Sequence, residues 1–83
     1  MTKNEFSVHL EEKMAAARKR ISSKMTKSDR MDSGRVAFLT ALKHVVDGAG
    51  SPEDLGTLDA VNDVLQDLGM LAKSKTFLAM LEP

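Results

Sequence analysis

The two histidines, His9 and His44, are the side chains of this 83-residue sequence best suited to acid–base catalysis or metal binding. Neither belongs to a Glu-x-x-His or His-x-x-x-His pattern, which would place two ligands on one face of a helix. His9 follows Glu5 by four residues, the spacing of an ordinary surface pair. His44 lies in the last turn of an expected helix, where the helix dipole favours its positive form. We therefore expect neither histidine to be a catalytic base or a metal ligand.

Other common chemistries also lack the residues that they need. The sequence has no cysteine, which excludes thiol catalysis, disulfide scaffolds and zinc fingers. No serine lies in a motif with an activating base. The glycines of Gly48-Ala49-Gly50 lack the preceding strand and the Lys-Ser/Thr ending of a phosphate-binding loop. We expect a protein that is not an enzyme and that has no cofactor.

Three aspartates, Asp59, Asp63 and Asp67, form the one repeated charged pattern. A spacing of four residues places them on one face of a helix, where like charges cost about 0.2–0.5 kcal/mol per pair. A calcium site fits poorly, because calcium loops draw their ligands from turns. Two interpretations stay open. The aspartates form a solvated face, or they bind a basic surface.

The best candidate for such a basic surface is the run Arg18, Lys19 and Arg20 of a second copy of the chain. The net charge of zero hides a segregation, because residues 1–35 carry nine basic and five acidic residues, a net charge of +4. Residues 36–83 carry three basic and seven acidic residues, a net charge of −4. This asymmetry is typical of ordinary surface charge, of two halves that attract each other, or of a basic segment that binds an acidic partner such as nucleic acid.

The first 30 residues are expected to form a helical arm that ends in a polar linker. A helix over residues 3–25 begins with a capping box of Thr2 and Glu5. The linker covers residues 22–33, and Asp32 or Ser33 is the next plausible N-cap. The arm carries a narrow apolar stripe at spacings of three and four residues. Its members are Phe6, Leu10, Met14, Ala17, Ile21 and Met25.

Residues 31–83 are expected to form a compact helical domain. The apolar face of a helix over residues 34–47 is broad enough to contact two neighbours, which predicts the central helix. Ser51 and Pro52 then signal a helix start. That helix covers residues 52–68 or begins after Thr57, and Gly69 closes it. A short last helix begins at residue 70 or covers residues 74–81. The sequence thus predicts an all-α fold, a small bundle of three to four helices with a long N-terminal helix.

The apolar stripe of the first helix leads to two alternatives for assembly. A small domain buries little surface, and the stripe is long and narrow, so we expect it to be the seam of a homodimer. In the alternative, the first helix folds back on the helix over residues 34–47 and the protein is a monomeric bundle.

These patterns favour a small cytoplasmic regulatory or adaptor protein that binds another protein and self-associates. Six methionines suit an adaptable binding surface, and no apolar run reaches the ~18 residues of a membrane span. The alternative is nucleic-acid binding by the basic N-terminal half. Against it, Arg18, Lys19 and Arg20 point about 100° apart on a helix. The sequence also lacks Tyr and Trp for base stacking.

Overall fold

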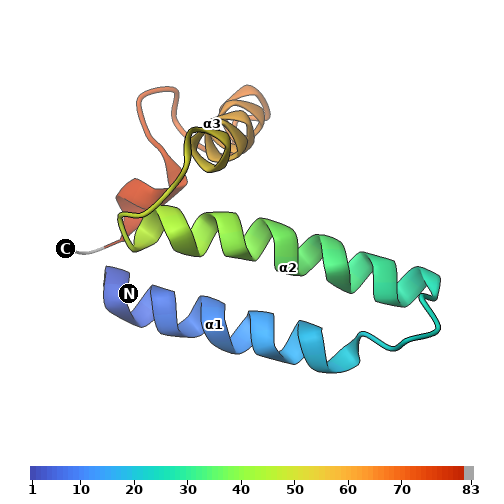
Figure 1. The fold of residues 1–83 in the computed structure, drawn as a ribbon. Helices are drawn as coiled ribbons and strands as arrows, with labels where there is room; N and C mark the ends of the chain where they lie inside the picture. The colour runs from blue at the N-terminus through green and yellow to red at the C-terminus, as the bar shows by residue number, and fades with distance from the viewer. Residues whose placement is uncertain (82–83) are drawn as a thin grey trace.

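The computed structural model describes residues 1–81 and contains four helical elements. They are α1 (Lys3–Arg20), α2 (Lys27–Val46), α3 (Pro52–Asp67) and a short 3₁₀ helix, η1 (Phe77–Met80) (Figure 1). Residues 1–81 contain no β-strand. The prediction of an all-α bundle with a long N-terminal helix is therefore confirmed. No helix in these residues has the length and apolar character needed to cross a bilayer.

Each α-helix begins with a capping box, in which two side chains satisfy amides at the helix start. In α1 the pair is Thr2 and Glu5, as predicted, and the Glu5 amide donates to the Thr2 hydroxyl at 3.1 Å. In α3 the pair is Ser51 and Asp54, which confirms the start at Pro52. In α2 the pair is Thr26 and Asp29, which the sequence analysis missed.

Helix α2 consequently begins at Lys27, whereas the sequence predicted a polar linker to residue 33. The serine, threonine and aspartate side chains of this stretch suggested a loop, but Thr26 and Asp29 use their side chains to start a helix. Helix α1 ends at Arg20, five residues before the predicted end. Met25 lies in the intervening loop with a φ of +51° and an exposed side chain.

Helices α1 and α2 form an antiparallel hairpin and lie side by side along their length (Figure 1). Leu10, Met14 and Ala17 are buried between them and are at most 3% exposed. The expected boundary between an arm of residues 1–30 and a domain of residues 31–83 therefore falls inside α2, and residues 1–20 are part of the same core. Residues 82 and 83 of that expected domain lie outside the described residues.

Helix α3 crosses the hairpin at a steep angle. Figure 1 shows α3 nearly end on, whereas α1 and α2 are seen lengthwise. Leu58 of α3 meets Leu10 of α1 and Leu42 of α2 in the core. Helix α2 contacts both α1 and α3, which confirms that it is the central helix. Thr57 does not begin a new helix, because its hydroxyl donates to the Glu53 carbonyl at 3.0 Å within a continuous α3.

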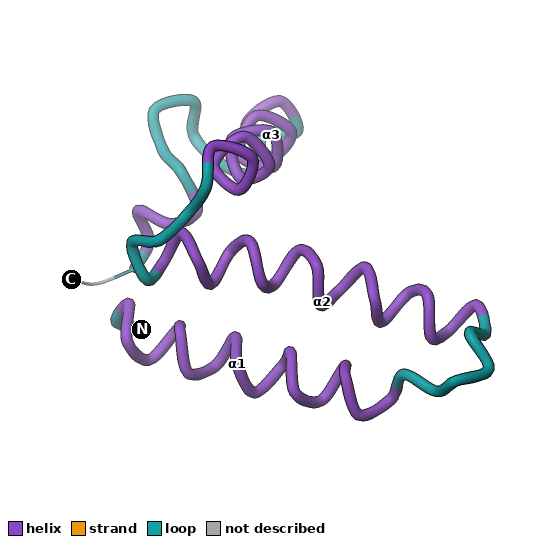
Figure 2. Tube along the Cα trace, viewed as in Figure 1, coloured by secondary structure: helices purple, strands orange, loops and turns teal. Residues whose placement is uncertain are grey.

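The chain after α3 turns back through a loop to η1 (Figure 2). Gly69 ends the helix with a φ of +74°, as expected of a glycine cap. The predicted last helix is only the 3₁₀ turn η1, which Thr76 caps. Buried Asn62 accepts a hydrogen bond from the Phe77 amide at 3.0 Å, and so fixes η1 against α3.

Candidate protein-binding groove

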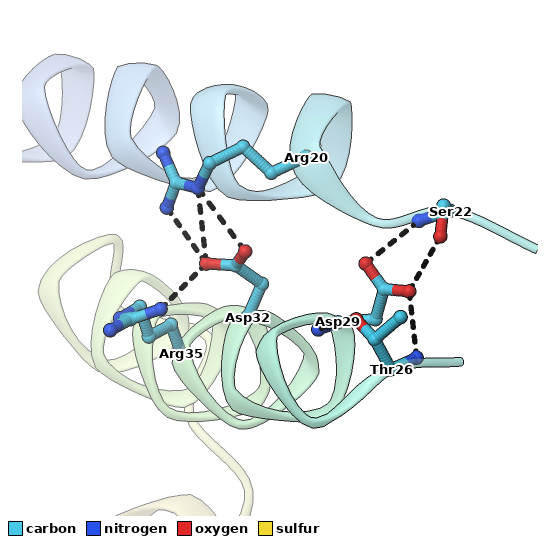
Figure 3. Close-up of polar contacts among 6 residues, drawn as sticks. All are labelled: Arg20, Ser22, Thr26, Asp29, Asp32 and Arg35. Atoms are coloured by element: carbon cyan, nitrogen blue, oxygen red, sulfur yellow. Dashed lines mark hydrogen bonds and ion pairs between the residues drawn. The ribbon is translucent and has the colours of Figure 1, made fainter. Parts of the chain in front are cut away.

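Two buried carboxylates close the turn between α1 and α2. We call this cluster the turn clasp, and its six residues are Arg20, Ser22, Thr26, Asp29, Asp32 and Arg35 (Figure 3). Asp32 is 1% exposed, and its Oδ1 atom accepts from Arg20 Nη2 at 2.8 Å and from Arg35 Nη1 at 2.7 Å. Arg20 Nε lies 3.2 Å from both carboxylate oxygens. One carboxylate thus orients two guanidinium groups from different helices.

The second carboxylate of the turn clasp, Asp29, binds neutral donors. It accepts from the Ser22 hydroxyl at 2.6 Å, the Ser22 amide at 3.1 Å and the Thr26 amide at 2.9 Å. These hydrogen bonds, the Ser22 hydroxyl first, lower the pKa of Asp29 from 3.8 to about 2. For Asp32, the hydrogen bond from Arg20 is the largest cause of a lowered pKa. Both side chains are charged at neutral pH. Asp29 ties the loop to α2, and Asp32 ties α1 to α2.

Beside the turn clasp, α1 and α2 enclose a groove of about 530 Å³, which we call the α1–α2 groove. Its lining consists of an apolar floor and a basic rim. The floor residues are Ala16, Ala17, Phe38 and Leu39, and the rim residues are Lys13, Arg20 and Arg35. Because Asp32 is the only acid bound to these three cations in the described residues, the rim keeps a net positive charge.

The chemistry of the α1–α2 groove is that of an apolar floor flanked by positively charged side chains. Small alanine side chains let a partner approach the backbone, and the aromatic and aliphatic floor offers apolar contact. Within residues 1–81, no group of three or more His, Asp or Glu side chains could hold a metal ion. The two histidines lie on different helices and have different neighbours. The ring of His9 stacks on Phe6 at 6.5 Å, and His44 Nδ1 lies 3.3 Å from Asp54 Oδ2.

The structure separates the three basic residues that the sequence analysis grouped. Arg20 belongs to the turn clasp and to the groove rim. Arg18 instead pairs with Glu11 at 3.6 Å, and Lys19 is exposed outside the groove. The helical period predicted that these three side chains point in different directions, and of the three only Arg20 lines the groove.

The three aspartates of α3 are exposed, and none of them forms an ion pair within residues 1–81. Apolar side chains lie beside them at the surface. Val64 is 55% exposed and Leu68, the C-cap residue, is 69% exposed. We call this surface the outer face of α3, and its residues are Asp59, Ala60, Asp63, Val64, Asp67 and Leu68. The sequence predicted its acids but not the exposure of its apolar residues.

The apolar stripe expected to join two copies lies largely inside one chain. Leu10, Met14 and Ala17 are buried, and Phe6 packs against the core cluster. Ile21 is partly buried at the α1 C-cap. Within one chain α1 therefore folds back on its neighbour, as in the second alternative, and this packing occupies the buried part of the stripe.

Four residues of the groove were not expected at a common site, and these are Lys13, Arg35, Phe38 and Leu39. A signal for them exists, because residues 13, 16, 17 and 20 recur at helical spacing and so do 35, 38 and 39. Each set shares one face of its helix. The spacing does not reveal that the two faces lie together across a hairpin.

No protein-family model, no curated protein and no solved structure matches this chain. The class of protein is therefore defined by its fold alone. It is a small all-α bundle in which a third helix crosses a helical hairpin.

Proposed function

We propose that this chain is a small non-enzymatic regulatory or adaptor protein of the cytoplasm that acts by binding protein. The observation that supports the proposal is the pair of unpartnered amphipathic surfaces, the α1–α2 groove and the outer face of α3. Apolar patches edged by charge are typical of protein-binding sites, since the apolar part supplies affinity and the charges supply orientation.

The exposure of the methionine side chains also supports this proposal. Met25, Met31, Met70 and Met80 are each at least half exposed, whereas Met14 is buried. Exposed thioether side chains adapt to varied apolar surfaces, as flexible binding proteins require.

Affinity capture from the cells that naturally express the protein tests this proposal. The variants are Lys13→Glu in the groove rim and Val64→Asp on α3, with Lys19→Glu and Val8→Asp as matched exposed controls. We expect a bound protein, either another chain or a second copy of this one, that the controls retain and at least one test variant loses. Capture that depends on neither Lys13 nor Val64 would contradict the proposal.

A second candidate, nucleic-acid binding, rests on the charge at the turn between α1 and α2. Residues 18–30 carry six cations and one acid, and that acid, Asp29, is buried among hydrogen-bond donors. The six cations are Arg18, Lys19, Arg20, Lys24, Lys27 and Arg30. A gel-shift titration across salt tests it. Micromolar binding to DNA or RNA at ~150 mM salt that weakens steeply as salt rises would favour this candidate.

A further inference from the structure

The outer face of α3 combines exposed apolar residues with acidic residues. This composition suits a helix that binds a partner better than a helix that faces only solvent. Leu58 and Asn62 point into the core, so residues on the opposite side point outward. There Val64 and Leu68 expose apolar surface beside a row of three aspartates. The described part of the chain supplies no cation to offset the repulsion between them.

The α1–α2 groove is complementary to this face in charge and in length. Three cations line the rim of the groove, and three aspartates line the outer face of α3. Lys13 and Arg20 stand seven residues apart on α1, about 10 Å along its axis. Asp59 and Asp67 stand eight residues apart on α3, about 12 Å along its axis. A helix laid on the groove can therefore place its acids along the basic rim.

The groove floor and α3 of the same chain also share one apolar core. Phe38 and Leu39 line the groove and pack against the core cluster that contains Leu58 of α3. Because one chain carries both a donor surface and an acceptor surface, two copies can exchange them about a two-fold axis. Each copy then gives one helix and receives one, which closes the assembly as a dimer.

We propose that the occupant of the α1–α2 groove is α3 of a second copy of this chain, bound reciprocally, and this rests on the proposed function of protein binding. The acids of each α3 lie against Lys13, Arg20 and Arg35 of the partner, and Val64 covers the apolar floor. A single copy buries only five apolar side chains in residues 1–81, so the added apolar burial stabilises both copies.

Light scattering during size-exclusion chromatography tests the proposal on the full chain. At about 100 μM the wild-type protein should have twice its chain mass of 9.1 kDa. Two variants reverse charge on the opposing surfaces, Lys13→Glu in the groove and Asp63→Lys on α3. Each should raise the dimer dissociation constant at least tenfold, about 1.4 kcal/mol, while circular dichroism stays unchanged. Lys19→Glu and Glu12→Lys, exposed on α1 outside the groove, should leave the dimer intact.

The two variants mixed together give the sharpest result. In a mixed dimer, the two substituted side chains would face each other at one contact, with the signs of their charges exchanged. Wild-type Lys13 and Asp63 would face each other at the second contact, so both contacts regain attraction. We therefore expect the mixture of Lys13→Glu and Asp63→Lys to dimerise more tightly than either variant does alone. Weakening without restoration in the mixture would overturn the pairing of these two surfaces.

Other outcomes also overturn the proposal, and each indicates a different role for the groove and for the outer face of α3. A wild-type mass of 9.1 kDa at every concentration excludes a second copy. If such a monomer still captures another protein through Lys13 or Val64, the groove belongs to a different chain and the proposed function stands. If the monomer binds DNA or RNA instead, the rim belongs to nucleic acid. A dimer insensitive to both reversals has its interface on another surface.

Discussion

The hairpin of α1 and α2 binds its aspartates within the chain, whereas the outer face of α3 does not. At one end of the hairpin, Asp32 binds Arg20 and Arg35. At the other end, Asp47 accepts from the Ser7 hydroxyl and from Lys43, each at 2.7 Å. The three aspartates of α3 have no such cation in residues 1–81.

This difference separates charges that build the fold from charges that remain available for a partner. Asp32 and Asp47 are bonded to both α1 and α2, so their removal affects folding. Asp59, Asp63 and Asp67 of α3 are exposed and bind no other element, so their removal should affect mainly what approaches from outside.

The largest effect is expected at the contact between the two regions, at Leu10. Leu10 is 1% exposed and meets Leu42 and Leu58 in the core. Leu10→Ala should lower the free energy of unfolding by about 2–5 kcal/mol, because it removes buried surface and leaves a cavity. Urea denaturation measures it. Val8→Ala, on the same helix but 60% exposed, should change it by less than about 0.5 kcal/mol.

The next effect is expected in the turn clasp. Asp32→Ala removes the carboxylate that Arg20 and Arg35 share and leaves two guanidinium groups close together without it. We expect the melting temperature to fall by several degrees, measured by far-UV circular dichroism. Asp63→Ala on α3 is the matched control and should leave the melting temperature nearly unchanged. Equal losses in both variants would contradict the division between the two regions.

Acid should loosen the hairpin through the same clasp. The pKa of Asp29 is about 2 in the folded chain and 3.8 ordinarily, so the unfolded state binds more protons between these values. Its stabilisation is fully present above about pH 4 and is lost as the pH falls toward 2. Hydrogen bonds also lower the pKa of Asp32, Asp47 and Asp54, which adds in the same direction.

Unfolding titrations from pH 5 to pH 2 measure this dependence. The isosteric variant Asp29→Asn should be less stable than the wild type at pH 5 and should lose less stability as the pH falls. A variant with the same pH slope as the wild-type protein would show that Asp29 does not contribute.

The smallest effect is expected at the junction of α3 and η1. Asn62→Ala removes the acceptor of the Phe77 amide, a loss of about 1 kcal/mol. Hydrogen exchange should show faster exchange at Phe77 and Ala79, while the amides of α1 and α2 keep their protection. Faster exchange throughout the chain would mean that η1 and the hairpin unfold as one unit.

Local signals in the sequence predicted most of the helices, and the misses have local causes too. The helix starts at Lys3 and Pro52 and the closing glycine Gly69 follow from the chemistry of caps, which acts over three or four residues. The start of α2 was missed because Thr26 and Asp29 also suit a loop, and the partner that makes the difference, Ser22, lies on the far side of the turn.

The sequence by itself determined most of the helical residues and the apolar faces of α1 and α2. The broad apolar face of α2 required two neighbours, and the spacing of the α3 aspartates placed them on one side. Helical periodicity carries this information, because it depends only on residues within a few turns of one another.

Only the tertiary structure decided what covers each face. The stripe of α1 packs on α2 of the same chain, and Arg20 and Arg35 converge on Asp32 from two helices. The periodicity of α1 is equally compatible with a second copy as its neighbour, since an apolar face specifies burial and not the identity of the partner. The short loop of residues 21–26, closed by Asp29, brings α2 back along α1 and so chooses between them.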